Sequence, residues 1–452
     1  MTRRLAVIGG DAAGMSAAAT ARRRDRDLDI VAFERGGHTS YSACGIPYFV
    51  AGLVDEVGDL VARSPVEHRA RGIDVRIRHE VVAIDLAARE LTVRDLNARR
   101  ELREPFDEVL VATGAAATPP PVPGVEATEA ARTIDAGERL RDQVLRGGDD
   151  AVVVGGGYIG LEMAEALVMR GLRVTLLDRA PQLMTTLDPD IAALVQDAAE
   201  GKGIRVLLSV DVEEILLDDG GRPRGVRTSD GDLPAAHVVV ATGVRPEVRI
   251  AREAGLTIGE SGALAVDDHQ RCPGHDGVWA AGDCVESHHR LLDRPVNVQL
   301  GTHANKQGRI AGTNITGGDL AFPGVLGTAI SRICSREIAR TGLNEREAAD
   351  AGLDVLATTV ETDTRAGYFP GSAPMWVKLV AARDDHRLLG AQIVGAPTAG
   401  KRIDTFATAI WTGLTVDELQ WVDLSYAPPM SGVLDPVLVA ARASASALAR
   451  AA

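Results

Sequence analysis

The chain has 452 residues, 45% of them hydrophobic, and carries a formal net charge of −14. This length supports two or three domains with large cores, and the acidic balance argues against nucleic-acid or anionic-membrane binding. No apolar run reaches 18 residues and the first residues lead directly into a strand, so we expect a cytoplasmic protein with no signal peptide and no membrane span.

The first predicted element is an apolar strand at residues 5–8, followed by a glycine-rich turn at 9–14 and a helix of small residues at 15–24. This order of elements holds the pyrophosphate of a dinucleotide at the helix N-terminus. The glycine spacing is imperfect, because Asp11 stands where the middle glycine of the fingerprint would be. The next strand ends at Glu34, about 20 residues later, where an acidic side chain can bind ribose hydroxyls. A solvated strand end is the alternative interpretation.

A cysteine follows this strand in the stretch S-Y-S-A-C-G-I-P-Y, residues 40–48. Gly45 and Pro47 predict a helix start beside Cys44, and the field of a helix N-terminus would lower the pKa of the thiol. The alternative is a small residue packed in a loop. No C-x-x-C pair includes Cys44 or the other cysteines, which are Cys272, Cys284 and Cys334. Thiol chemistry would therefore need an external partner, and we predict no metal site.

A second unit repeats the pattern with better spacing. A strand at 151–154 runs into G-G-G-Y-I-G at 155–160, a helix at 160–170 follows, and the next strand ends in Asp178. A carboxylate at this strand end repels a 2′-phosphate and so favours NADH over NADPH. The adjacent Arg179 leaves NADPH open.

Each unit closes with the same tripeptide. Residues 108–114 read E-V-L-V-A-T-G and residues 237–243 read H-V-V-V-A-T-G, and a later strand ends at Gly282 and Asp283. From about residue 324 the pattern changes to alternating strands and helices without a third fingerprint, which predicts a separate α+β domain. We interpret the alanine-rich end, 440–452, as a frayed helix.

This order of motifs resembles that of the pyridine nucleotide-disulfide oxidoreductases over essentially the whole chain. The resemblance implies an α/β fold with two Rossmann-like domains, in which an NAD(P)-binding domain (119–245) is inserted into an FAD-binding domain (1–118 and 246–323). It implies a C-terminal α+β dimerisation domain (324–452), a homodimer, and FAD with NADH or NADPH as cofactors.

The resemblance also assigns residues to the two cofactors. Those implied to bind FAD are Gly9, Gly14, Glu34, Arg35, Ala112, Thr113, Gly114, Gly282 and Asp283. Those implied to bind the nicotinamide nucleotide are Gly155, Gly157, Ile159, Gly160, Asp178 and Gly243.

The single cysteine in S-x-x-x-C-G-I-P-Y is similar to the branch of coenzyme A-disulfide reductases and NADH oxidases and peroxidases. Ala12 stands where the peroxidases and water-forming oxidases carry a histidine, which argues against chemistry through an oxidised cysteine. Tyr368 and Tyr426 match two tyrosines that in coenzyme A-disulfide reductases face the partner's cysteine. A phenol there can donate a proton or hydrogen bond to a leaving thiolate; the alternative is that both tyrosines only pack a dimer interface.

Coenzyme A also needs cations for its phosphates, and arginine can bind phosphate bidentately. The resemblance places substrate contacts at Ser16, Thr20, Arg23, Ser40, Arg71 and His303. Without it, a cluster such as the arginines at 22–26 is more often a solvated helix end. Ala43 departs from the family, because the coenzyme A enzymes usually carry asparagine there.

Three hypotheses follow. The first is an FAD-dependent NAD(P)H reductase of coenzyme A disulfide, or of a related low-molecular-weight disulfide or persulfide, acting through Cys44. The second is an NADH oxidase. The third is an electron-transfer flavoprotein that reduces a protein partner, or a redox sensor. The sequence leaves open the thiol, the choice between NADH and NADPH, and the extent of oxidase activity.

Overall fold

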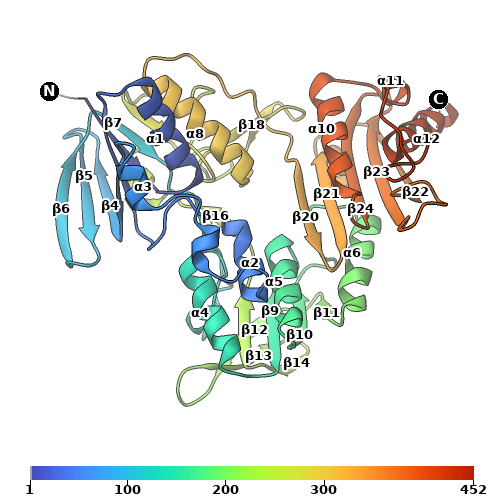
Figure 1. Ribbon diagram of the computed structural model, residues 1–452, viewed down its shortest axis with the longest axis horizontal. Helices are drawn as coiled ribbons and strands as arrows, with labels where there is room; N and C mark the ends of the chain where they lie inside the picture. Colours follow the sequence, from blue (N-terminus) through green and yellow to red (C-terminus); the bar gives the residue numbers. More distant parts are fainter. Residues whose placement is uncertain (1–2, 452) are drawn as a thin grey trace.

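Two parallel sheets carry the two glycine turns in the computed structural model, which describes residues 3–451 (Figure 1). The strand order is β17-β7-β1-β2-β3 in the first sheet and β11-β10-β9-β15 in the second. The first sheet contains β1 (Arg4–Ile8), β2 (Asp29–Glu34), β3 (Asp74–Ile77), β7 (Glu108–Val111) and β17 (Val278–Ala280). The second contains β9 (Asp150–Val154), β10 (Arg173–Asp178), β11 (Arg205–Leu208) and β15 (His237–Val240). Their apolar side chains are buried on both faces, as parallel sheets require.

The two glycine turns have the same geometry because each chain segment passes very close to a neighbouring backbone. Gly9 and Gly155 both have a φ of +112°, and a Cβ atom on either would lie within 2.3 Å of a carbonyl oxygen of the adjoining strand end. Asp11 takes the middle position of the first turn with an extended φ of −120°. A non-glycine residue adopts this conformation without strain, so the imperfect fingerprint still folds correctly.

Helices cover the sheets and connect the units. The first unit contains α1 (Ala12–Arg24), α2 (Ile46–Ala51), α3 (Pro65–Arg69), α7 (Arg249–Glu253) and α8 (Gly301–Ile315). The second contains α4 (Ile134–Leu145), α5 (Tyr158–Met169) and α6 (Pro189–Gly201). Helices α1 and α8 lie side by side (Figure 1). Gly308 and Gly312 allow this contact, since a Cβ on either would lie within 2.3 Å of a carbonyl oxygen of α1.

Short antiparallel elements complete the two units. Each unit has a three-stranded sheet, formed by β4 (His79–Asp85), β5 (Glu90–Asp95) and β6 (Arg100–Pro105) in the first and by β12 (Val212–Leu217), β13 (Pro223–Thr228) and β14 (Gly231–Pro234) in the second. The chain leaves the first unit along β8 (Ala115–Ala117) and returns along β16 (Val244–Pro246), which pair antiparallel. A further pair joins β18 (Ser287–His289) and β19 (Arg294–Val296).

The C-terminal part is a five-stranded antiparallel sheet with helices, shown in orange and red in Figure 1. Its strands are β20 (Ala329–Ile333), β21 (Arg336–Gly342), β22 (Val355–Asp363), β23 (Pro374–Ala382) and β24 (Leu388–Gly395). Its helices are α9 (Glu345–Asp350), α10 (Ile403–Thr412), α11 (Val416–Leu419) and α12 (Pro436–Ala451). The predicted α/β class with two Rossmann-like units and an α+β C-terminal domain is confirmed. The domain boundaries given above stay predictions.

The prediction of a frayed C-terminal helix is wrong. Helix α12 begins at Pro436, and its apolar side, including Val437 and Leu448, is buried against β22 and β23. The alanines that suggested fraying are small enough to let the helix approach the sheet closely. Ala452 lies outside the described residues. Across residues 3–451, no helix combines the length and apolar character needed to cross a membrane.

Candidate active site

The first candidate cofactor cleft lies at the carboxyl ends of β1 and β2. The Glu34 carboxylate accepts hydrogen bonds from the backbone N–H of Gly10 (2.9 Å to Oε2) and of Gly36 (2.7 Å to Oε1). These bonds fix the carboxylate beside the glycine turn, within reach of a ribose bound there. Glu34 and the exposed Arg35 also line a cavity of about 230 Å³.

Residues after β7 and β17 line the same edge of the sheet. Ala112 donates its N–H to the Ile8 carbonyl, and the Thr113 hydroxyl donates to the Glu247 carbonyl at 2.6 Å. Gly114 has a positive φ, and a Cβ there would meet no protein atom within 4 Å, so it faces open space. Gly282 donates its N–H to Gln307 Oε1 at 2.9 Å. The edge thus offers backbone surface that a flat or extended cofactor can approach, and these residues fit FAD.

Arg132 and Asp11 belong to this cleft, although neither was selected from the sequence. Arg132 reaches in from the second unit and donates to Asp283 Oδ2 at 3.3 Å. Asp11 Oδ1 accepts the N–H of Tyr41 at 3.2 Å. Burial, reinforced by Glu34, raises the pKa of Asp11 to about 6. Arg132 therefore brings a positive charge to a group of carboxylates, where a pyrophosphate needs one; its position in sequence carries no signal of this.

The second candidate cleft repeats the first. Asp178 Oδ2 accepts the N–H of Gly156 at 2.6 Å and Oδ1 accepts that of Ala180 at 2.8 Å, so the carboxylate is held against the glycine turn as Glu34 is. A Cβ on Gly157 or on Gly243 would meet no protein atom within 4 Å. Gly155 and Gly160 are buried beneath the turn, Ile159 is half-buried in the first part of α5, and Arg179 is exposed beside Asp178.

Cys44 lies in a single 3-10 turn (Ala43–Gly45) immediately before α2, as the sequence predicted. Helix α2 packs against α4 and α5 of the second unit, so the thiol lies at the junction of the two units (Figure 1). Cys44 is exposed, whereas Cys272, Cys284 and Cys334 are buried. Of the four cysteines, Cys44 is the one open to a substrate.

The predicted lowering of the Cys44 pKa is wrong. Cys44 retains exposed surface, but the surrounding protein desolvates its thiol, and this burial together with the carboxylate of Glu162 raises the pKa. The backbone hydrogen bond near the helix start acts in the opposite direction and is weaker. Helix α2 has six residues, too few for a strong terminal field. Glu162 itself lies in α5 and accepts a short hydrogen bond from the Ser331 hydroxyl.

Four of the six predicted substrate residues lie on the adjacent helices α1 and α8. Ser16 donates to Asn305 Oδ1 of α8 at 2.6 Å, and Arg23 donates to the Thr20 hydroxyl at 3.0 Å. His303 is buried in α8, its Nδ1 has no partner among the described residues, and burial lowers its pKa. Arg22, by contrast, caps the end of α1 through backbone carbonyls that include that of Gly72. Within the arginine cluster, Arg22 is therefore structural, whereas Arg23, Arg24 and Arg26 are exposed.

Ser40 lies beside the first glycine turn, donating its N–H to the Gly10 carbonyl at 3.0 Å, whereas Arg71 lies beside the end of α1. Ser40 has a φ of +50°, unusual for a residue with a side chain, and its hydroxyl lies 2.9 Å from His68 Nε2. His68 is buried, and this burial together with Arg63 and Arg71 lowers its pKa to about 4. A neutral imidazole therefore fixes the Ser40 side chain. Arg22 of α1 donates to the carbonyl of Gly72, the residue after Arg71, so Arg71 is a neighbour of the predicted substrate residues on α1.

Tyr368 and Tyr426 come together on the C-terminal domain. Both are exposed, at 77% and 46%, and a hydrogen bond with Tyr368 raises the pKa of Tyr426. Two phenols far apart in sequence thus form one exposed pair. Their exposure is what a contact with a second subunit would require.

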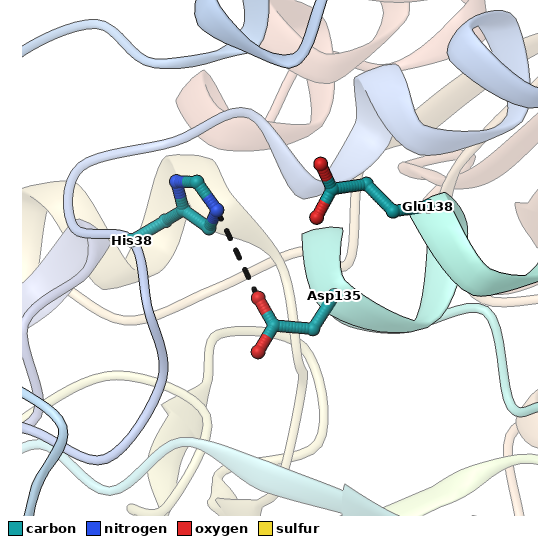
Figure 2. Close-up of side chains that lie close together, drawn as sticks. All are labelled: His38, Asp135 and Glu138. Atoms are coloured by element: carbon teal, nitrogen blue, oxygen red, sulfur yellow. Dashed lines mark ion pairs between the residues drawn. The ribbon is translucent and has the colours of Figure 1, made fainter. Parts of the chain in front are cut away.

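Groups of histidine and carboxylate side chains that could hold a metal ion occur among the described residues. One consists of His38, Asp135 and Glu138 (Figure 2). The Arg78 guanidinium lies 2.9 Å from Asp135, which opposes a metal ion there. The expectation that the protein binds no metal stays a prediction.

Two acidic strand ends beside two glycine turns define a protein that binds two dinucleotides, and the exposed thiol at their junction is typical of an oxidoreductase. The family model described as pyridine nucleotide-disulphide oxidoreductase matches residues 3–308, and the model for the dimerisation domain of these enzymes matches residues 328–437. The chain belongs to this family and uses FAD and NAD(P)H.

Similar proteins narrow the class. A CoA-dependent NAD(P)H sulfur oxidoreductase from Pyrococcus abyssi is 35% identical over 96% of this chain and 97% of that protein. An NADH oxidase from Methanocaldococcus jannaschii is 34% identical over 97% and 98%, and a coenzyme A disulfide reductase from Staphylococcus aureus is 27% identical over 95% and 96%. The structure of an NAD-dependent persulfide reductase from A. fulgidus has a TM-score of 0.94 at 36% identity, covering 99% of this chain and 84% of that one. The chain is an oxidoreductase of the group of persulfide and coenzyme A disulfide reductases, which includes NADH oxidases.

Proposed function

We propose that the protein reduces coenzyme A disulfide, or a related low-molecular-weight disulfide or persulfide, through Cys44. The observation that carries the proposal is the position of Cys44, the exposed cysteine at the junction of the two units, while the other three cysteines are buried. A thiol without a second cysteine beside it must form its disulfide with the substrate.

In the proposed cycle, the Cys44 thiolate attacks one sulfur of the disulfide R–S–S–R, forms Cys44–S–S–R and releases one R–S⁻. Bound FAD supplies the route by which two electrons from NAD(P)H cleave this mixed disulfide, which returns the Cys44 thiolate and releases the second R–S⁻. Two protons complete the two R–SH products, one from NAD(P)H oxidation and one from solvent. Glu34, Thr113, Asp283 and Arg132 would hold FAD, and Asp178 the nucleotide.

Two observations support a homodimer in which the tyrosines act across subunits. The chain contains the dimerisation domain of its family. Tyr368, Tyr426, Trp421, Met430 and Val433 expose large apolar surfaces on that domain. A second copy would cover them, and the Tyr368 and Tyr426 pair of one subunit would then stabilise the thiolate that leaves from Cys44 of the other.

Contacts for coenzyme A are proposed on α1, α8 and the α3 region. Arg23 and Arg71 are exposed cations, and neither pairs with an acidic side chain among the described residues. Ser16, Thr20, Ser40 and His303 supply polar atoms nearby. For the electron donor, the fixed Asp178 carboxylate supports NADH over NADPH, with exposed Arg179 acting in the opposite direction.

Replacing Cys44 tests the proposal. We expect Cys44→Ala to keep bound FAD but to lose disulfide-dependent NAD(P)H oxidation by at least about a thousandfold, because the nucleophile is removed. Cys272→Ala, a change at a buried cysteine, should retain this activity. Full turnover of coenzyme A disulfide by Cys44→Ala would contradict the proposed mechanism.

An NADH oxidase is the second candidate, since two relatives carry that name. Ala12 argues against the water-forming version. Oxygen consumption and disulfide-dependent NAD(P)H loss should be measured on one preparation, and an NAD(P)H rate that ignores added disulfide would favour the oxidase.

A further inference from the structure

A bridge of charged side chains joins the two units beside the cavity at Glu34. Asp135, the second residue of α4 in the second unit, places Oδ2 2.9 Å from the Arg78 guanidinium and Oδ1 3.8 Å from His38 Nε2. His38 and Arg78 both belong to the first unit, in the loop after β2 and between β3 and β4. Figure 2 shows the His38 ring and the Asp135 carboxylate pointing toward each other across the gap between the two segments.

The bridge and the candidate adenosine site share one cavity. Glu34, Arg35, His38, Arg78 and Asp135 all line the same space of about 230 Å³. A dinucleotide whose ribose contacts Glu34 therefore lies in the space that the bridge spans. The bridge connects the loop that follows Glu34 to a helix of the other unit, so widening the cavity at this point would separate Asp135 from Arg78 and His38.

The backbone holds Arg78 and Asp135 of the bridge in place. Arg78 has a φ of +57° and donates its N–H to the Gly36 carbonyl at 3.0 Å. Its guanidinium packs over Gly37, where a Cβ atom would lie only 2.8 Å from it. Asp135 lies in the first turn of α4, whose N-cap is Thr133. Arg78 and Asp135 are thus positioned by their own elements and need no ligand to meet.

Neighbouring charges do not substitute for this bridge. Arg139, on the next turn of α4, makes a bidentate ion pair with Glu129 at 2.8 and 3.0 Å. Glu138 lies close to His38 and Asp135 but makes no ion pair with a described residue within 4.0 Å. Asp135 is therefore the acidic residue that connects α4 to the first unit here.

We propose that the Asp135, Arg78 and His38 bridge retains FAD, and that these ion pairs must open before the adenosine end of the cofactor can leave. The bridge is a positioning device and takes no part in sulfur chemistry. Its side chains remain partly exposed, 43% for Arg78 and 26% for Asp135. Ion pairs of this kind are individually weak and screened by salt. We therefore expect a moderate effect on the rate of FAD release.

The test measures FAD release from the purified holoprotein, as the rise in flavin fluorescence after dilution, for wild type, Asp135→Asn and Glu138→Gln. Both variants lose one negative charge from the start of α4, but Asp135 alone is in the bridge. We expect Asp135→Asn to release FAD about three- to tenfold faster at low ionic strength and to lose most of the salt dependence seen in wild type. Glu138→Gln should match wild type.

Arg78→Gln approaches the same bridge from the other unit and gives a second route if Asp135→Asn does not fold. We expect it to accelerate release as Asp135→Asn does, and the double variant to be no faster than the faster single variant, because both remove one contact. Equal release rates for Asp135→Asn and Glu138→Gln, or fully additive effects of Arg78→Gln and Asp135→Asn, would overturn the proposal. The readout is independent of disulfide turnover, so it is unaffected if the proposed substrate is wrong.

Discussion

Cys44 and Glu162 belong to different units, and the Glu162 carboxylate adds to the effect of burial on the pKa of the Cys44 thiol. Burial and the Glu162 carboxylate raise the pKa of the Cys44 thiol, so this thiol is less readily ionised than that of a free cysteine. An enzyme that uses a thiolate near neutral pH then depends on charges brought by cofactor and substrate. Glu162 lies in α5, beside the second glycine turn, where a bound nucleotide would bring such charges close to it.

Replacing Glu162 should lower the Cys44 pKa, since removing a nearby negative charge favours the thiolate. We expect Glu162→Gln to move the pH midpoint of iodoacetamide alkylation at Cys44 to lower pH and to speed alkylation at pH 7. Glu165→Gln, on the same helix and not among the main causes of the raised Cys44 pKa, is the control. Identical midpoints for Glu162→Gln and wild type would show that burial alone sets the pKa.

The residues of the candidate site were predictable where a local motif carried them. Cys44, Glu34 and Asp178 each follow a strand or precede a helix in a recognisable pattern. Arg132 lies in a segment without such a pattern, and Glu162 lies in the predicted helix after the second glycine turn but carries no local signal that it faces Cys44. Only the packing of the second unit against the first brings them there. The wrong pKa direction for Cys44 has the same origin, because burial is a property of the fold.

At the scale of elements, the sequence predicted the glycine turns, the strands around them and the two acidic strand ends. These depend on apolar runs and on close backbone approach at Gly9 and Gly155, which are local features. Helix α12 was misjudged because small residues weaken a hydrophobic pattern although they pack well. Its burial depends on packing against β22 and β23, strands that lie far from the helix in the sequence.

The packing of α12 can be tested at Leu448, which is 3% exposed. We expect Leu448→Ala to lower the free energy of unfolding by about 2 to 4 kcal/mol, from lost burial and the cavity left behind. Arg442→Ala, at an exposed position of the same helix, should change it by less than about 0.5 kcal/mol. Chemical unfolding monitored by circular dichroism measures both, and a Leu448→Ala effect as small as that of the control would mean that the helix end is frayed.

At the scale of the whole molecule, the second unit is tied to both of its neighbours. Asp188, just before α6, exchanges two hydrogen bonds with Gln392 of β24, at 2.8 and 2.6 Å, and its carboxylate lies 3.3 Å from buried Lys378. On the other side, α2 packs on α4 and α5, and Asp135 reaches Arg78. The second unit is therefore held between the first unit and the C-terminal domain, and Cys44 lies on one of these contacts.

The central proposal is that Cys44 exchanges with a small thiol and that the cofactors bound by the two units supply its electrons. The most direct test is mass spectrometry of the oxidised holoprotein after incubation with coenzyme A disulfide, without NAD(P)H. We predict a mass increase of one coenzyme A thiol per chain, located on the peptide that contains Cys44 and removed when NAD(P)H is added. An unmodified Cys44, or an adduct that NAD(P)H does not remove, would contradict the account.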